Sequence, residues 1–91
     1  MKPNIDKSKF LFEQNKYHEA IENCNGIIEK DSNSIDAIKL IAKSLLALKE
    51  TQEARLYLNK TLNIDPDNYE VIKDIGNTYL AEGDPSMAKN Y

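Results

Sequence analysis

The residues of this sequence that could carry catalysis or hold a metal include one histidine and one cysteine. His18 is the only imidazole and Cys24 the only thiol among the 91 residues. Two such side chains cannot make a structural zinc site, which takes four ligands. His18 stands at the start of an expected helix without a recognisable nucleophile nearby, so we expect a solvated surface residue. Cys24 lies on an apolar stripe with Ile21 and Ile28 and is expected to be a small buried hydrophobe.

The glycine and carboxylate patterns give no other reactive centre. Gly26, Gly76 and Gly83 form neither a GxGxxG turn nor a phosphate-binding loop. The 15 Asp and Glu residues fall mostly on expected solvent faces and form no recognisable acid–base pair. We therefore predict no enzyme activity, no metal and no cofactor within these residues.

Composition and charge exclude several kinds of partner and location. Hydrophobic residues make up 41% and charged residues 30% of the chain, as in a small soluble globular domain. A net charge of −3 argues against nucleic acid, because phosphate binding needs a basic excess. Lys39 and Lys43 interrupt the most apolar run, "IKLIAKSLLAL", so no membrane span is predicted. The N-terminus lacks a signal-peptide core and a single cysteine cannot form an intrachain disulfide, so we predict a cytoplasmic location.

Apolar residues recur at helical spacing along the whole sequence. Ile38, Ile41 and Leu45 follow the i, i+3, i+7 spacing of one buried helix face. No segment alternates with a period of two residues, so no strand is predicted. Asp84 followed by Pro85 is a strong helix start. The pattern predicts six helical segments, at residues 4–14, 17–30, 35–48, 51–63, 69–82 and 85–91.

The short stretches between these segments contain helix start and stop signals. Asn33 and Asp67 each precede an acidic residue by three positions and are expected to cap the helices that follow. Gly83 can take the left-handed conformation that closes the preceding helix. Asn15 could take it less easily, and Lys49 is a poorer choice.

Residues of the same kind recur every 34 positions. The evenly spaced rows are Ala20, Ala54 and Ala88; Ser8, Ala42 and Gly76; and Leu11, Leu45 and Tyr79. A fixed period of this length with helix–turn–helix content is a repeat signature. Small side chains at fixed points let two antiparallel helices approach closely, while larger residues fill the groove between them.

On these residues the chain resembles the tetratricopeptide repeat (TPR) family. The third unit carries the likeness in "IGNTYLAEGDPSMA", with Gly76, Tyr79, Gly83 and Ala88. The other two units match at Ile38, Ile41, Ala42, Leu45, Ala54, Leu58 and Pro66, and at Leu11, Tyr17, Ala20 and Ile21. The resemblance implies an all-α fold. It would be a right-handed superhelical α-solenoid of antiparallel helix pairs, with two complete repeats and a truncated third.

The resemblance covers the whole chain as a single TPR-like domain, residues 1–91. The implied repeats are residues 1–34, 35–68 and 69–91, and the last is expected to continue in a longer native protein. Asn4 and Lys7 stand where the family has bulky residues, as expected of a first repeat whose outward face is polar.

In the TPR family the first helices of the repeats line a concave groove that binds peptides. The resemblance therefore assigns groove positions to Lys9, Phe12, Lys39, Lys43, Leu46, Lys73, Asn77 and Leu80. Lys39, Lys43 and Leu46 share one helix face because they are four and three residues apart. The result is a basic ladder beside an apolar stripe, bordered by Asp36 and Glu70, which favours a peptide with acidic groups and apolar anchors. The same rows also fit a solvated helix face, with the apolar members in ordinary packing.

We therefore expect a protein–protein interaction scaffold that binds a peptide or partner protein on its concave face, without catalysis. Two alternatives stay open. One is a self-associating structural module, a homo-oligomer through the apolar C-terminal end. The other is an accessory segment of a larger multidomain enzyme.

One function found in the family is not predicted for this chain. TPR domains that grip the C-terminal carboxylate of chaperones use a clamp of Lys, Asn, Asn, Lys and Arg. The corresponding positions here are Ile5, Lys9, Leu40, Glu70 and Asp74. None keeps the required residue type, and two are acidic where cations are needed.

Overall fold

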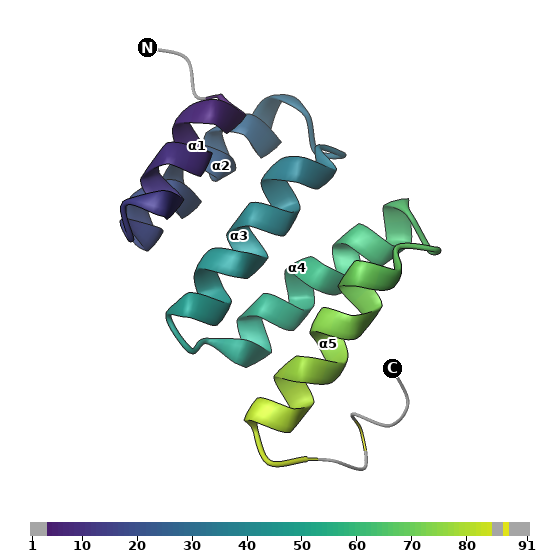
Figure 1. Ribbon diagram of the computed structural model, residues 1–91. Helices are drawn as coiled ribbons and strands as arrows, with labels where there is room; N and C mark the ends of the chain where they lie inside the picture. The colour runs from purple at the N-terminus through teal and green to yellow at the C-terminus, as the bar shows by residue number, and fades with distance from the viewer. Residues whose placement is uncertain (1–3, 85–86, 88–91) are drawn as a thin grey trace.

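The protein is built from helices joined by tight turns (Figure 1). The computed structural model describes residues 4–84 and residue 87. Within these residues the helices are α1 (Ile5–Glu13), α2 (Tyr17–Lys30), α3 (Ile35–Ala47), α4 (Thr51–Ile64) and α5 (Tyr69–Ala81). Their ends differ from the predicted ranges by at most one residue. The sixth predicted segment, 85–91, lies outside the described residues apart from Met87.

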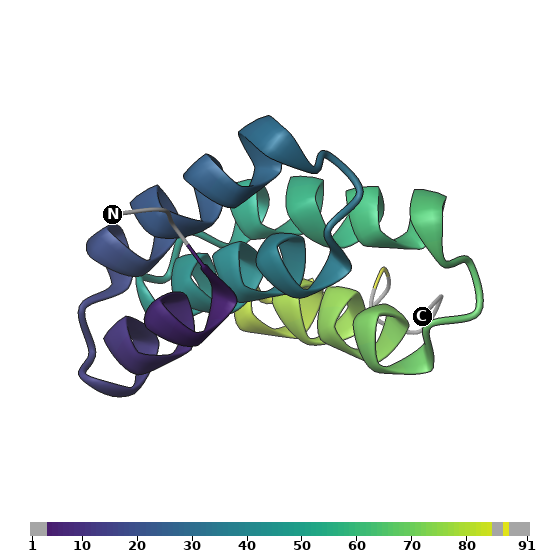
Figure 2. The same cartoon turned by 90° about the horizontal axis from the view of Figure 1, so that it is seen from above.

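The helices form two layers. Figure 2 shows α1, α3 and α5 side by side in one layer, with α2 and α4 in the other. Each helix packs against the next along the chain, and α3 also packs against α1. This arrangement confirms the predicted all-α solenoid of antiparallel helix pairs. It leaves one surface formed by α1, α3 and α5 alone, which we call the first-helix face.

The rows of small residues lie at the helix contacts, as predicted. Ser8, Ala42 and Gly76 are all buried in the first layer. Ala20 and Ala54 are fully buried in the second layer. Small side chains at these points let the helix axes approach closely, so the rows set the spacing between layers. Ala88, the third member of the alanine row, lies outside the described residues.

The apolar core consists of two clusters that follow the chain direction. The first cluster contains Cys24, Ala37, Leu40, Ile41, Leu45 and Ala54. The second contains Ala42, Leu58, Val71 and Ile75. Tyr57 packs against both clusters. The core is therefore a continuous strip between the two layers and has no single centre.

The turn after each first helix has the same backbone geometry in all three repeats. Asn15, Lys49 and Gly83 all have positive φ values, of 63°, 63° and 76°. In each turn the N–H of this residue donates to a carbonyl three residues earlier, over 3.0 Å. The next N–H donates to a carbonyl five residues earlier, over 2.8–2.9 Å. These two hydrogen bonds form the Schellman motif that ends a helix. The left-handed conformation predicted for Gly83 is confirmed, and Lys49 adopts it despite being the poorest choice.

The predicted helix caps at Asn33 and Asp67 are wrong by one residue. The N-cap residues are Ser34 and Asn68, and the Asn68 side chain accepts a hydrogen bond from the Val71 N–H at 3.2 Å. The shift has a simple cause. In the turn before each helix, the N–H of Ser34 or Asn68 donates to a carbonyl three residues earlier. The turn therefore ends at Ser34 or Asn68, and this residue, one position later than predicted, is the extended N-cap.

Candidate functional site

The predicted groove residues all belong to the helices that form the first-helix face. Lys9 and Phe12 come from α1, the set Lys39, Lys43 and Leu46 from α3, and the set Lys73, Asn77 and Leu80 from α5. The polar members are exposed, except that Lys39 is partly buried. The fold therefore brings three sequence segments, spaced by one repeat, onto one surface.

The apolar members of the groove differ in how they are used. Phe12 and Leu46 are partly buried and pack against the first core cluster. Phe12 also makes an edge-to-face contact with Tyr17, with ring centroids 5.4 Å apart. Leu80, in contrast, is 56% exposed. The predicted apolar stripe is thus partly core at its α1 and α3 positions and freely accessible on α5.

The lysines of α3 are already paired with an acid from the same protein. The Glu70 carboxylate lies 3.3 Å from the Lys39 Nζ atom through Oε2, and 4.0 Å from the Lys43 Nζ atom through Oε1. Glu70 stands in the first turn of α5 and belongs to the acidic row that was predicted only to border the ladder. The basic ladder is therefore a mixed-charge seam between α3 and α5.

Asp74 lies one turn after Glu70 in this seam and is partly buried. Burial raises the pKa of its carboxyl group, and the nearby Glu70 charge raises it further. The charges of Lys43, Lys39 and Lys73 act in the opposite direction on the same pKa. The rise shows that removal from water outweighs the attraction of the lysines at this position.

A pocket of about 410 Å³ lies where α3 and α5 end. It is lined by Leu46, Lys49, Thr51, Asn77, Thr78 and Ala81, and we call it the anchor pocket. Leu46 and Asn77 were predicted as groove residues, and the sequence reasoning missed the others. Lys49 lies in the turn between α3 and α4 and Thr51 is the first residue of α4, so tertiary structure brings them to the site. Ala81 had a sequence signal, since it repeats the position of Ala47 one repeat later.

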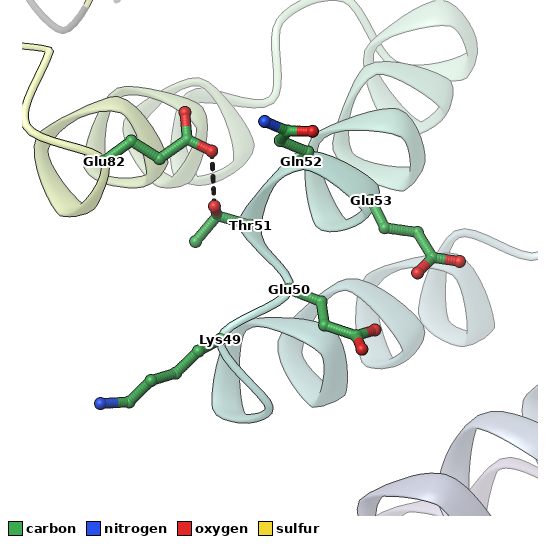
Figure 3. A pocket seen from close by; sticks show the side chains of 6 residues that line it. All are labelled: Lys49, Glu50, Thr51, Gln52, Glu53 and Glu82. Atoms are coloured by element: carbon green, nitrogen blue, oxygen red, sulfur yellow. Dashed lines mark hydrogen bonds between the residues drawn. The ribbon is translucent and has the colours of Figure 1, made fainter.

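A second pocket, of about 360 Å³, adjoins the anchor pocket at Lys49 and Thr51 (Figure 3). The Thr51 hydroxyl donates to Glu82 Oε2 at 2.5 Å. Figure 3 shows the side chains of Glu50 and Glu53 pointing away from Glu82. These carboxylates do not converge on one point, so the second pocket has no arrangement for acid–base catalysis or metal binding.

Arg55 fixes α5 to α4 beneath these pockets. Its Nη1 atom donates to Glu82 Oε1 at 2.7 Å and to Thr78 Oγ1 at 3.1 Å. The guanidinium carbon lies 4.1 Å from the centre of the Tyr79 ring. Hydrogen bonds from Arg55 and Thr51 lower the pKa of Glu82. Arg55 therefore positions the wall of the anchor pocket, a role that its sequence position alone did not suggest.

The histidine and the cysteine singled out in the sequence, His18 and Cys24, lie in different environments. His18 is exposed and Cys24 is completely buried, as predicted. Burial raises the pKa of the Cys24 thiol, while a hydrogen bond with Ser8 acts in the opposite direction. Burial therefore favours the protonated form of this thiol. Among residues 4–84 and 87, no three His, Cys, Asp or Glu side chains gather as a metal site would require.

No helix in the described part of the chain is long and apolar enough to cross a membrane.

Comparison with known proteins supports the fold and the repeat. The family model described as tetratricopeptide repeat matches residues 11–68, more than half of the chain. The solved structure named "MamA MSR-1 C2" superposes with a TM-score of 0.82 and 19% sequence identity over 94% of this chain. That overlap spans 52% of the length of the MamA chain, and at this identity the likeness concerns the fold. A search of curated proteins gave no match.

Proposed function

Because this chain belongs to the tetratricopeptide repeat family, whose members are protein-interaction scaffolds, we propose that it binds a peptide segment of a partner protein on its first-helix face. The segment would lie along the seam between α3 and α5. An apolar side chain of the partner would enter the anchor pocket, and the polar groups at its rim would orient the peptide backbone. No catalytic step is part of this proposal.

The anchor pocket is the observation that carries the proposal. Leu46 and Ala81 supply apolar wall from two different helices, α3 and α5. Asn77 and Thr51 are among the polar residues that line the same pocket. A mainly apolar hollow with a few convergent polar groups is the usual form of a small recognition site. Its volume, about 410 Å³, exceeds that of one leucine or phenylalanine side chain.

Filling the pocket tests this proposal. Peptides that bind the protein would first be selected from a random displayed library, and their affinities measured by fluorescence anisotropy. Ala81→Arg places a long side chain in the pocket from an exposed position at the end of α5, so the fold is expected to persist. We expect the selected peptides to bind A81R at least about tenfold more weakly, because the site for the apolar anchor is occupied.

Ala47→Arg is the matched control for this experiment. Ala47 is also exposed, also ends its helix, and stands one repeat before Ala81, but it does not line the anchor pocket. Similar affinities of A81R and A47R for every selected peptide would rule out the anchor pocket as the binding site.

We propose self-association as a second function, supported by the apolar residues that α5 exposes. Tyr69 is 78% exposed and Leu80 is 56% exposed, so both could be buried in a contact with a second copy. Light scattering over a range of protein concentrations is expected to give a mass that rises with concentration, and Leu80→Lys is expected to reduce the rise. A monomer mass at all concentrations would refute self-association.

A further inference from the structure

Glu70 occupies the place that an acidic ligand group would be expected to take. Its two carboxylate oxygens each face one lysine, at 3.3 Å from Lys39 and 4.0 Å from Lys43. The lysines stand one turn apart on α3, and the acid comes from α5, 31 residues along the chain from Lys39. The protein itself therefore supplies an anion to this pair of cations.

Asp74 adds a second carboxylate to the same seam. Its electrostatic neighbours are Glu70 and Lys73 on its own helix, and Lys39 and Lys43 on α3. Two acids of α5 thus oppose two lysines of α3, and with Lys73 these groups carry a net formal charge of +1. The seam between α3 and α5 consequently has a weaker positive potential than a ladder of unpaired lysines would give it.

The ion pairs of Glu70 are exposed enough to exchange with a ligand. The side chain of Lys39 is 22% exposed, that of Lys43 49% and that of Glu70 58%. Solvated ion pairs of this kind contribute little free energy, because water and salt screen them. A single ligand carboxylate that displaced Glu70 would exchange one weak ion pair for another. An isolated acidic residue in a ligand therefore gains little affinity here.

We infer that Glu70 sets the charge selectivity of the seam between α3 and α5 by acting as an internal ligand of Lys39 and Lys43. This inference rests on the proposed function. With Glu70 in place, the apolar side chain that enters the anchor pocket decides which segment binds. Without Glu70, the lysine pair becomes an anion site directly beside that pocket. Lys43 and Leu46 are one turn apart, about 5 Å along the helix, which one or two residues of an extended peptide span.

Two matched peptides can test this inference. The probes are the capped peptide Gly-Glu-Glu-Leu-Gly and its neutral counterpart Gly-Gln-Gln-Leu-Gly, titrated into ¹⁵N-labelled protein and followed by NMR. Glu70→Gln is expected to bind the acidic peptide about two- to fivefold more tightly than the natural sequence does, the range set by exposed ion pairs. Binding of the neutral peptide is expected to stay unchanged. Adding Lys39→Gln and Lys43→Gln to E70Q is expected to remove the gain.

Glu22→Gln is the charge-matched control. Glu22 is exposed on α2, in the other layer, so E22Q changes the net charge equally and is expected to behave like the natural sequence. Equal affinity of E70Q and the natural sequence for the acidic peptide would overturn the inference, as would an equal gain in E22Q. In either case, continued shifts of the Leu46 and Asn77 amides would leave the proposed function standing. If neither peptide shifts these amides in any variant, the proposed function fails for this pocket, and the inference fails with it.

Discussion

At the scale of single residues, Asp74 shows how the repeat adapts one position to three surroundings. The position is held by exposed Asp6 in the first repeat, by Leu40 in the core of the second, and by partly buried Asp74 in the third. Asp74 therefore carries a charge where the second repeat buries a hydrocarbon. Since desolvation raises its pKa, this residue ties the stability of the fold to pH.

The first prediction concerns Asp74→Asn. A folded-state pKa above the unfolded-state value means that the folded chain holds this proton more tightly. The contribution of Asp74 to stability is therefore full below about pH 4, its unfolded pKa, and is lost as pH rises through the raised folded value. Urea unfolding should show that D74N has a higher free energy of unfolding than the natural sequence. This difference should grow between pH 4 and pH 7.

Asp6→Asn provides the control for this pH series. Asp6 occupies the equivalent repeat position and is exposed, so D6N alters the net charge equally without relieving a buried group. The difference in the free energy of unfolding between D74N and the natural sequence could fail to change with pH, or D6N could show the same change. Either result would contradict burial of Asp74 as the cause.

The second prediction concerns Arg55, whose contacts join α4 to α5. Arg55→Ala removes the hydrogen bond to Thr78 and the contact with the Tyr79 ring from a side chain that is only 14% exposed. The free energy of unfolding should fall by about 1–2 kcal/mol. Arg55→Lys keeps the charge but loses the planar fork, so an intermediate loss is expected. Equal stability of R55A and the natural sequence in urea titrations would contradict the role given to Arg55.

At this scale, the sequence predicted which groove residues share a helix face but not what they contact. The four-residue spacing of Lys39 and Lys43 was sufficient to place them together. Their pairing with Glu70 depends on the distance between α3 and α5, which helical periodicity does not contain. For the same reason the contacts of Arg55 with the following repeat could not be predicted.

At the scale of the elements, the shared turn geometry controls where each first helix ends. The left-handed residue is asparagine, then lysine, then glycine along the chain. A side chain in this conformation is strained by contact with the backbone, least for asparagine among non-glycine residues, while glycine avoids the strain. The three turns therefore carry different costs for the same hydrogen bonds.

The third prediction compares substitutions at these turns. Lys49→Gly should raise the free energy of unfolding by about 0.5–1 kcal/mol, because backbone strain is removed and part of the gain is offset by chain entropy. Asn15→Gly should gain less. Gly83→Ala should lose about 1 kcal/mol, and strain alone explains the loss because an added Cβ meets no atom within 4 Å. Thermal and urea unfolding check this order, and a K49G variant less stable than the natural sequence would contradict it.

Helix positions were predicted well from the sequence because apolar periodicity and turn residues agreed. The caps at Asn33 and Asp67 were misplaced because the polar runs around them contain several residues that can cap a helix. Only the backbone hydrogen bond that closes each turn selects Ser34 and Asn68. After the first helices only one residue in each turn has a positive φ value, and this residue fixes where the helix ends.

At the scale of the whole molecule, the core is a strip of two clusters linked by Tyr57. The molecule is accordingly flat and elongated, with extents of 45 × 26 × 16 Å. In such a structure each repeat is stabilised mainly by its neighbours, so local stability can differ along the chain.

The fourth prediction compares two buried leucines, one from each cluster. Leu58→Ala and Leu45→Ala remove the same atoms and should each cost about 2–5 kcal/mol. Hydrogen exchange should show that L58A reduces protection mostly in α4 and α5, and that L45A reduces it mostly in α2 and α3. Equal loss along the chain in both variants would indicate one cooperative unit and contradict a difference in local stability between the two clusters.

The recurring turn geometry has a consequence for how this sequence can change in length. Because the same backbone turn returns every 34 residues, a helix pair begins and ends in the same local environment as the next. A duplication or deletion of 34 codons would join equivalent turns and preserve the register of the buried rows. A change of one to three codons within a helix would rotate every later side chain by about 100° per residue and misplace those rows. Viable length variants of this gene should therefore differ in whole helix pairs.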